Sequence, residues 1–308
     1  MTYLEKISNF DENNLPSLDE VVLWALELFE KWNLEKLNIN KFEKPLIAGS
    51  WNAIVTAEII FSWTDAIFCD ETNFDTYINK KIDWLIILSA SWEKHANIFA
   101  KKAINKWIEV KLLTCNQNSS AMNIIWKKNT TITKKNREPY TYNTSTYLWW
   151  ILAITWEEAN LIKNHIQEYI DPIINNIDFS KYDSYLLITP NKFSSVNQLF
   201  IVKFIELFWR KIARDVFSYE QFKHAITVIP HKTELAISFW EWEFFYEWNQ
   251  IHIPLDINCN IWWMMAIGYY VIWKIQNSYP HYFKENIWKY IKDVNNTEFW
   301  KWLKVIVE

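Results

Sequence analysis

The chain has 308 residues, of which 50% are hydrophobic and 22% are charged, and its net charge is −4. This length suffices for one large or two medium domains with a substantial core, and the lack of a basic stripe argues against a nucleic-acid-binding protein. The first ten residues are charged and no apolar run is long enough to cross a bilayer, so we expect neither a signal peptide nor a membrane protein. Cys69, Cys115 and Cys259 form no Cys-x-x-Cys motif, which favours a reducing cytoplasm.

The chain contains 21 tryptophans and two glycines, whereas ordinary usage gives about 22 glycines at this length. Several tryptophans stand where glycine is expected: Trp51 and Trp92 in turns that precede helical patterns, and Trp107 between a predicted helix and the next strand. One interpretation is that these positions are UGA codons read as glycine, which fits the frequent Ile, Lys and Asn, whose codons are AT-rich. The other is a genuinely tryptophan-rich protein.

The first half of the chain alternates between strand-like and helix-like segments. Residues 17–37 carry apolar side chains at helical spacing, and we expect this helix to pack on the first domain. The continuous apolar run at 83–89 is typical of a strand in a parallel sheet covered on both faces. The predicted strands are 46–48, 66–69, 83–89 and 110–114, with helices at 52–61 and 95–106. This order predicts a doubly wound α/β fold.

The second half repeats the same order. Residues 130–142 are polar and predict a loop, helices follow at 144–170, and Pro172 with the Asn-rich run after it marks a boundary. Further strands are predicted at 185–188, 212–216 and 235–239, with helices at 194–208 and 219–225. We therefore predict an N-terminal helical segment (1–44), a first subdomain with bridging helices (45–171) and a second subdomain with C-terminal helices (172–308).

Two loops of the first half combine serines with the suspected glycines: Gly49-Ser50-Trp51-Asn52 and Ser89-Ala90-Ser91-Trp92-Glu93. Each ends a parallel strand and begins a helix, so backbone N–H groups and the positive helix end converge at the carboxyl edge of the sheet. Serine hydroxyls add neutral donors suited to a phosphate. Alternatively, the serines only cap helices. The predicted phosphate-binding residues are Ser50, Trp51, Asn52, Ser89, Ser91, Trp92 and Lys94.

With glycine at 51 and 92 these loops, followed by Thr114-Cys115-Asn116, resemble those of the sugar isomerase (SIS) domain. The family usually continues the second loop with a threonine, where this chain has Glu93-Lys94-His95. Arg137 lies between the halves, where the phosphoglucose/phosphomannose isomerase branch also carries an arginine. The resemblance covers residues 45–308 and implies two flavodoxin-like three-layer subdomains.

In the second half, Glu206 and the segment 217–224 resemble the Glu…Lys-His segment of double-SIS isomerases, and residues 303–308 are similar to the tail of glucosamine-6-phosphate synthase. The resemblance implies aldose–ketose isomerisation of a hexose 6-phosphate through a cis-enediolate. This reaction needs a group that opens the ring, a base that moves a proton between carbons, and a positive group that stabilises the oxyanion. The resemblance assigns these roles to His224, Glu206 and Arg137. In related dimers the histidine comes from the neighbouring subunit, which implies a homodimer.

Other interpretations stay open. Asp215 is a second candidate base, and Glu206, His224 and Arg137 also fit a helix polar stripe, a structural histidine and a solvated loop. The loops equally fit a non-catalytic SIS module that binds a phosphosugar as a sensor. If the tryptophans are genuine, a glycan-binding protein is a third possibility. The expected partner is a small phosphosugar, with no nucleic acid and no membrane, and nothing in the sequence calls for a metal or redox cofactor.

Overall fold

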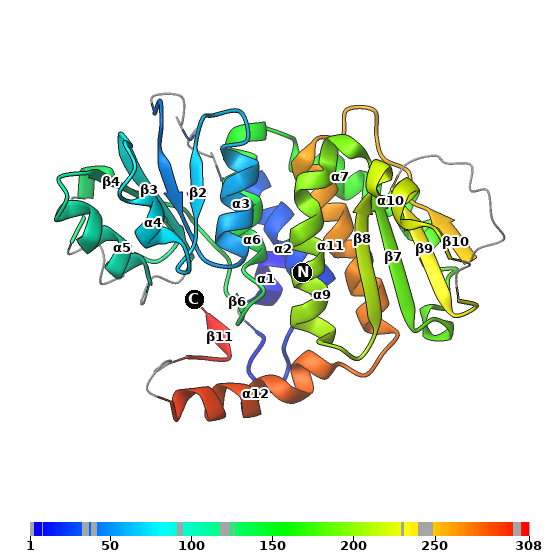
Figure 1. Ribbon diagram of the computed structural model, residues 1–308. Coiled ribbons are helices and arrows are strands. Elements are labelled where there is room, and N and C mark those ends of the chain that lie inside the picture. Colours follow the sequence, from blue (N-terminus) through cyan, green and yellow to red (C-terminus); the bar gives the residue numbers. More distant parts are fainter. Residues whose placement is uncertain are drawn as a thin grey trace. The chain divides into compact units, whose positions relative to one another are not determined.

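Figure 1 shows the computed structural model of the chain, which divides into two compact units. The first unit comprises residues 34–135 and 146–156, and the second comprises 1–33, 136–145 and 157–308. The subdomain boundary at 171/172 stays a prediction. The residues that the structure describes are 3–7, 9–32, 37, 42–90, 95–117, 124–125, 127–228, 231–239, 249–297 and 303–307.

The first unit contains a parallel five-stranded sheet in the order β2-β1-β3-β4-β5. The predicted strands of the first half are confirmed, and the fifth strand lies in the segment predicted to be a loop. It pairs Thr130–Ile132 with the end of β4, so a short polar strand completes the edge of the sheet. The strands are β1 (Leu46–Ala48), β2 (Ile67–Cys69), β3 (Trp84–Ser89), β4 (Glu109–Thr114) and β5 (Thr130–Ile132).

Helices cover both faces of this sheet (Figure 1). Helices α4 (Phe74–Tyr77) and α5 (His95–Ile104) pack on one face, where Phe74 and Phe99 join the buried Leu85 and Ile87 of β3. Helices α3 (Asn52–Ile60) and α6 (Thr144–Thr155) lie on the other face. The strand order is that of the flavodoxin-like fold, so the predicted doubly wound α/β class is confirmed.

The second unit contains a parallel four-stranded sheet in the order β10-β9-β7-β8. Its strands are β7 (Ser184–Thr189), β8 (Ala213–Ser218), β9 (Glu234–Ser238) and β10 (Asn249–His252). The chain moves from β7 to β8 through α9 (Asn197–Phe208), then back past β7 to β9 through α10 (Tyr219–Ala225). The two crossovers run in opposite directions along the sheet. Because crossovers between parallel strands are right-handed, α9 and α10 cover opposite faces of the sheet.

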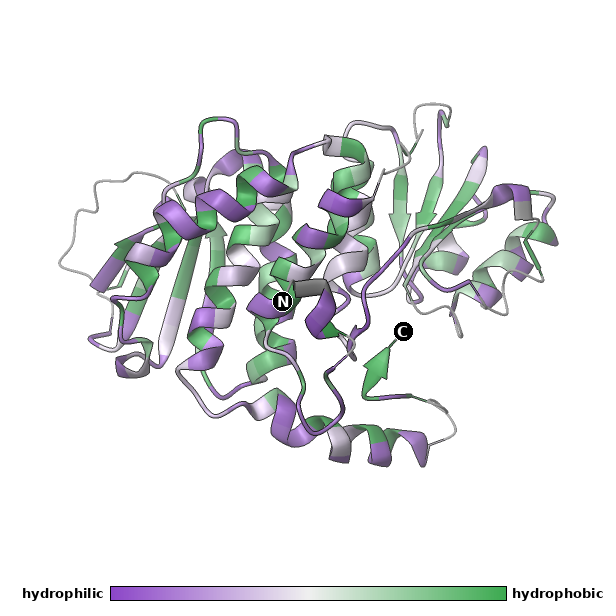
Figure 2. Cartoon of the chain, turned by 180° about the vertical axis from the view of Figure 1, so that it is seen from behind, coloured by the Kyte–Doolittle hydropathy of each residue, from purple (hydrophilic) through white to green (hydrophobic). Residues whose placement is uncertain are grey.

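Helix α11 (Ile261–Asn277) is mostly buried and contacts α2 (Leu18–Lys31), α7 (Ala159–His165) and α9 of the second unit. Figure 2 colours the residues of the chain by hydropathy. Helix α2 packs against α7 and α11 and belongs to the second unit. A capping box between Ser17 and Glu20 begins α2. The other elements are α1 (Tyr3–Ile7), a π turn (Ile166–Ile170), α8 (Asp171–Ile174), α12 (Tyr282–Asn295) and an antiparallel pair of β6 (Glu138–Pro139) with β11 (Ile306–Val307). No helix within the described ranges has the length and apolar character needed to cross a membrane.

Helices α9 and α11 approach closely at Gly268. A Cβ atom at this position would overlap the ring of Phe200, itself fully buried on α9. Glycine is therefore required here by packing rather than by backbone conformation.

We expect Gly268→Ala to destabilise the protein by about 1–3 kcal/mol, because a methyl group must displace the Phe200 ring in a filled core. Urea denaturation measures the loss. Asn277→Ala, at the exposed end of the same helix, is the control. Phe200→Leu should restore part of the stability in the double variant, and equal loss in single and double variants would contradict the overlap.

Candidate functional site

The first predicted loop lies where β1 ends and α3 begins. Gly49 donates its N–H to the Cys69 carbonyl at 3.2 Å. Trp51 then has φ 54° and ψ −123°, and its side chain is 56% exposed. Asn52 follows as the first helical residue and is buried. The loop therefore forms the tight strand-to-helix turn that the sequence predicts.

Ser50 in this loop is already engaged. Its hydroxyl donates to Glu71 Oε2 at 2.7 Å, and Glu71 lies two residues after β2, the strand beside β1. The hydroxyl hydrogen is therefore used, and Ser50 presents oxygen lone pairs rather than a donor. The Glu71 carboxylate also places negative charge beside the loop, which opposes a phosphate there. Sequence reasoning missed Glu71 because it lies 21 residues away along the chain.

The second predicted loop follows β3. Ser89 ends the strand at a partly exposed position, whereas Ser91, Trp92 and Lys94 lie outside the described residues. In the order β2-β1-β3-β4-β5, β1 and β3 are neighbours although their connections run in opposite directions. Ligands of open α/β sheets bind at such a switch point, outside the carboxyl ends of the strands. The first predicted loop and the end of β3 at Ser89 flank this point of the first unit.

A thiol lies at the same edge of the sheet. Cys115, just after β4, is buried and donates to the Ala90 carbonyl at 3.0 Å. Thr146 on α6 donates its hydroxyl to the Cys115 sulfur at 3.4 Å. These contacts connect the β3 and β4 loops to the first turn of α6.

In the second unit, Glu206 on α9 forms a buried ion pair with Lys203. Lys203 Nζ lies 2.7 Å from Glu206 Oε2, and the two side chains are 0% and 8% exposed. The ammonium group also donates to the carbonyls of Tyr142 at 3.1 Å and Thr141 at 3.4 Å. It lies 5.3 Å from the centre of the Tyr269 ring, where a cation is attracted by the ring face.

The contact with Lys203 fixes the orientation of the buried Glu206 carboxylate. Burial raises the pKa values of Tyr142 and Tyr140, and the nearby Glu206 charge adds to both shifts, so both phenols stay protonated. Sequence reasoning missed Lys203. The available signal was a lysine three residues before a glutamate on an otherwise apolar helix, a spacing that brings the two charges together.

His224 lies near the end of α10 and is exposed. Because α9 and α10 cover opposite faces of the sheet, the fold of one chain does not bring His224 to Glu206. Asp215 lies on the edge strand β8. Partial burial raises its pKa, and the charge of Arg214 opposes that shift.

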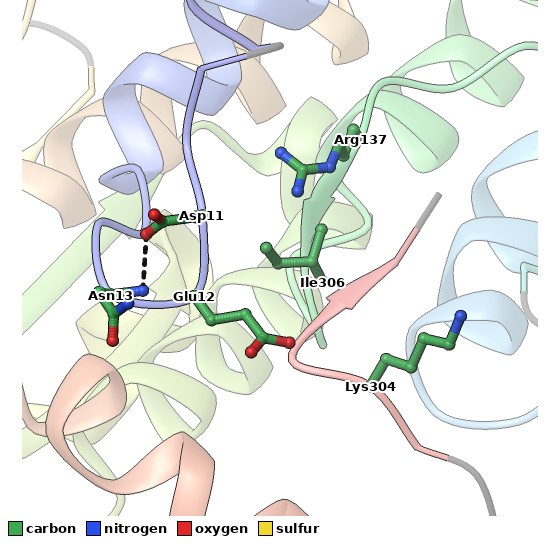
Figure 3. A pocket seen from close by; sticks show the side chains of 6 residues that line it. All are labelled: Asp11, Glu12, Asn13, Arg137, Lys304 and Ile306. Atoms are coloured by element: carbon green, nitrogen blue, oxygen red, sulfur yellow. Dashed lines mark hydrogen bonds between the residues drawn. The ribbon is translucent and has the colours of Figure 1, made fainter.

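Arg137 anchors the N-terminal segment. Its guanidinium donates to the carbonyls of Phe10 at 2.5 Å and Ile7 at 3.3 Å, and it lies 4.3 Å from the centre of the Phe10 ring. Figure 3 shows this side chain beside a cavity of about 310 Å³. The other lining residues are Asp11, Glu12, Asn13, Lys304 and Ile306.

Glu138, next to Arg137, holds the beginning of α6. Its buried carboxylate accepts the N–H groups of Thr144 at 2.6 Å and Ser145 at 2.8 Å, together with the Ser145 hydroxyl. A carboxylate at this position is favoured by the positive helix end. The first turn of α6 is therefore occupied by the chain's own anion. Among the described side chains, no group of three or more His, Cys, Asp or Glu is placed to hold a metal ion.

No protein family and no curated protein matches the sequence. Solved structures do match. Glucosamine-6-phosphate deaminase from Thermotoga maritima superposes with a TM-score of 0.58 at 12% identity, covering 90% of this chain and 93% of that one. The C-terminal domain of glucosamine-fructose-6-phosphate aminotransferase from Francisella tularensis gives 0.58 at 11%, covering 90% and 96%. Tagatose-6-phosphate ketose/aldose isomerase from Escherichia coli gives 0.55 at 11%, covering 91% and 90%.

These likenesses establish the fold. The chain shares the fold of these structures, with two parallel sheets flanked by helices, which agrees with the α/β fold expected from its sequence. At such low identity they leave the reaction and the substrate to be argued from this chain's own residues.

We expect Lys203→Met to lower the free energy of unfolding by about 3–5 kcal/mol, because it leaves Glu206 buried without its counter-ion. Urea denaturation measures the change. Adding Glu206→Gln should recover much of the loss by removing the unpaired charge. If the double variant is less stable than Lys203→Met alone, the pair is not the source of the effect.

Glu71→Gln should increase the affinity for a phosphosugar several-fold, because it removes one partly screened negative charge beside the loop at Ser50. Titration calorimetry with glucose 6-phosphate at low and high salt checks it, and the gain should shrink at high salt. Asp75→Asn, an exposed change on α4, is the charge-matched control. Equal gains in both variants would indicate a general charge effect rather than one at Ser50.

Proposed function

We propose that the protein is an aldose–ketose isomerase that acts on a hexose 6-phosphate through a cis-enediolate. The observation that carries this proposal is the buried Lys203–Glu206 pair. A carboxylate held in one orientation and shielded from water is suited to moving a proton between adjacent carbons. Structures of similar fold include a ketose/aldose isomerase and an aminotransferase domain, both of which are named for sugar phosphates.

In this mechanism Glu206 removes a proton from one carbon of the open-chain sugar and returns it to the next. Lys203 orients the carboxylate through its 2.7 Å contact with Oε2. His224 opens the ring, and the positive charge of Arg137 stabilises the enediolate oxygen. The phosphate is bound by the loops at 50–52 and 89–94, with the Ser50 hydroxyl released from Glu71 when the ligand arrives.

The opposite placement of α9 and α10 favours a homodimer in which His224 acts in the site of the neighbouring subunit. We therefore propose that each site combines Glu206 of one copy with His224 of another. We further propose that the protein works in the cytoplasm and needs no cofactor.

Purified protein should interconvert fructose 6-phosphate with an aldose 6-phosphate and exchange the C2 hydrogen with solvent. Glu206→Gln should reduce kcat by about 10²–10⁴-fold, since it removes the carboxylate that transfers the proton. Because the variant also leaves Lys203 without its counter-ion, urea denaturation must show that it is folded under the assay conditions. Glu220→Gln, on the exposed face of α10, is the control.

Two results separate the alternatives. If the unaltered protein binds the sugar phosphate tightly but does not convert it, the protein is a non-catalytic phosphosugar sensor rather than an isomerase. Mixing inactive Glu206→Gln and His224→Ala proteins should restore activity if each site takes its histidine from the other copy. No recovery after subunit exchange would contradict the shared site.

A further inference from the structure

The backbone identifies four tryptophans as occupants of glycine positions. We infer that residues 51, 107, 156 and 209 are glycine in the natural protein, because their codons are UGA triplets decoded as glycine and written as tryptophan in this sequence. Residues 51, 107 and 156 lie in the first unit and residue 209 in the second, and none of the evidence for glycine depends on the proposed enzymatic activity.

Tryptophan dominates the left-handed backbone positions. Among the described residues six non-glycines have positive φ, and four of them are tryptophans: Trp51 (54°), Trp107 (62°), Trp156 (58°) and Trp209 (51°). Tryptophan is 21 of 308 residues, about one in fifteen, so four of six is far above its share. Bulky residues are genuine outliers at positive φ, whereas glycine adopts it at no steric cost.

The local motifs demand glycine for two distinct reasons. At Trp107, N–H groups of Trp107 and Ile108 donate to the carbonyls of Ile104 and Ala103 at 3.0 and 3.1 Å. This pair of bonds is the Schellman motif that ends a helix, with Trp107 at the left-handed C′ position where glycine is usual. Trp51 and Trp209 have φ,ψ of 54°,−123° and 51°,−118°, the first central position of a type II′ turn, which glycine dominates.

None of these four tryptophans is buried in a core. The four side chains are 56%, 96%, 49% and 65% exposed in chain order. Trp150 makes the opposite case. It is fully buried on α6, donates its Nε1–H to Thr133 Oγ1 at 2.9 Å, and meets the Tyr147 ring edge-on. Trp209 has a surface contact, with the Arg210 guanidinium 5.8 Å from the centre of its ring, but none of the four tryptophans is a core residue as Trp150 is.

The gene and the native protein provide the decisive experiment. We expect UGA at codons 51, 107, 156 and 209, and peptide mass spectrometry of protein from the source cells should find glycine at each. UGG codons, or tryptophan-containing peptides spanning these positions, would overturn the inference.

Stability measurements on the recombinant tryptophan-bearing chain give an independent check. Trp107→Gly and Trp209→Gly should each raise the ratio of folded to unfolded protein by about tenfold, because a Cβ is strained in these conformations. Trp107→Ala and Trp209→Ala remove the same exposed indole but keep the Cβ, so glycine should exceed alanine at both sites. Trp150→Gly should instead destabilise by opening a cavity. Alanine equal to or better than glycine at 107 and 209 would show that the backbone there does not require glycine.

Discussion

The second unit depends on one buried ammonium group. Lys203 is the only fully buried charged side chain among the largest buried residues of the described chain, and it reaches three oxygen atoms on two elements. Two of these belong to the loop at 141–142, where Thr141 has φ 71°. A charge removed from water must be neutralised and fully hydrogen-bonded. The same contacts that satisfy Lys203 therefore hold the loop in a left-handed conformation and fix the orientation of Glu206.

The segment 136–145 is the hub of that unit. Arg137 holds the N-terminal segment through backbone carbonyls, Glu138 holds the first turn of α6, and β6 pairs with β11 near the other end of the chain. Arg137, the β6 pair and the carbonyls of Thr141 and Tyr142 thus all make contacts distant in sequence. A substitution here perturbs several elements together, so lost activity in an Arg137 variant needs a stability measurement beside it.

Patterns that are local in sequence predicted the fold well. Continuous apolar runs such as 83–89 marked buried parallel strands, and serine-containing turns marked their ends. Four strands were missed, all of them short: β5 and β10 are mostly polar, β6 contains a proline, and β11 has only two residues. Lys203, Glu138 and Glu71 were missed as well. The partner of Glu71 lies close only in the folded chain. The burial of Lys203 and Glu138 could not be predicted because charged residues are usually exposed.

The pairing of β6 with β11 joins Glu138 to Val307. During synthesis this strand pair cannot form until residue 307 has left the ribosome, whereas the strands of the first unit are complete by residue 132. Contacts of such sequence separation form late and slow the final step of folding. The helices that pack on α11 all precede β11 in the chain, so the core around α11 can form first and the β6–β11 pair is added to it afterwards.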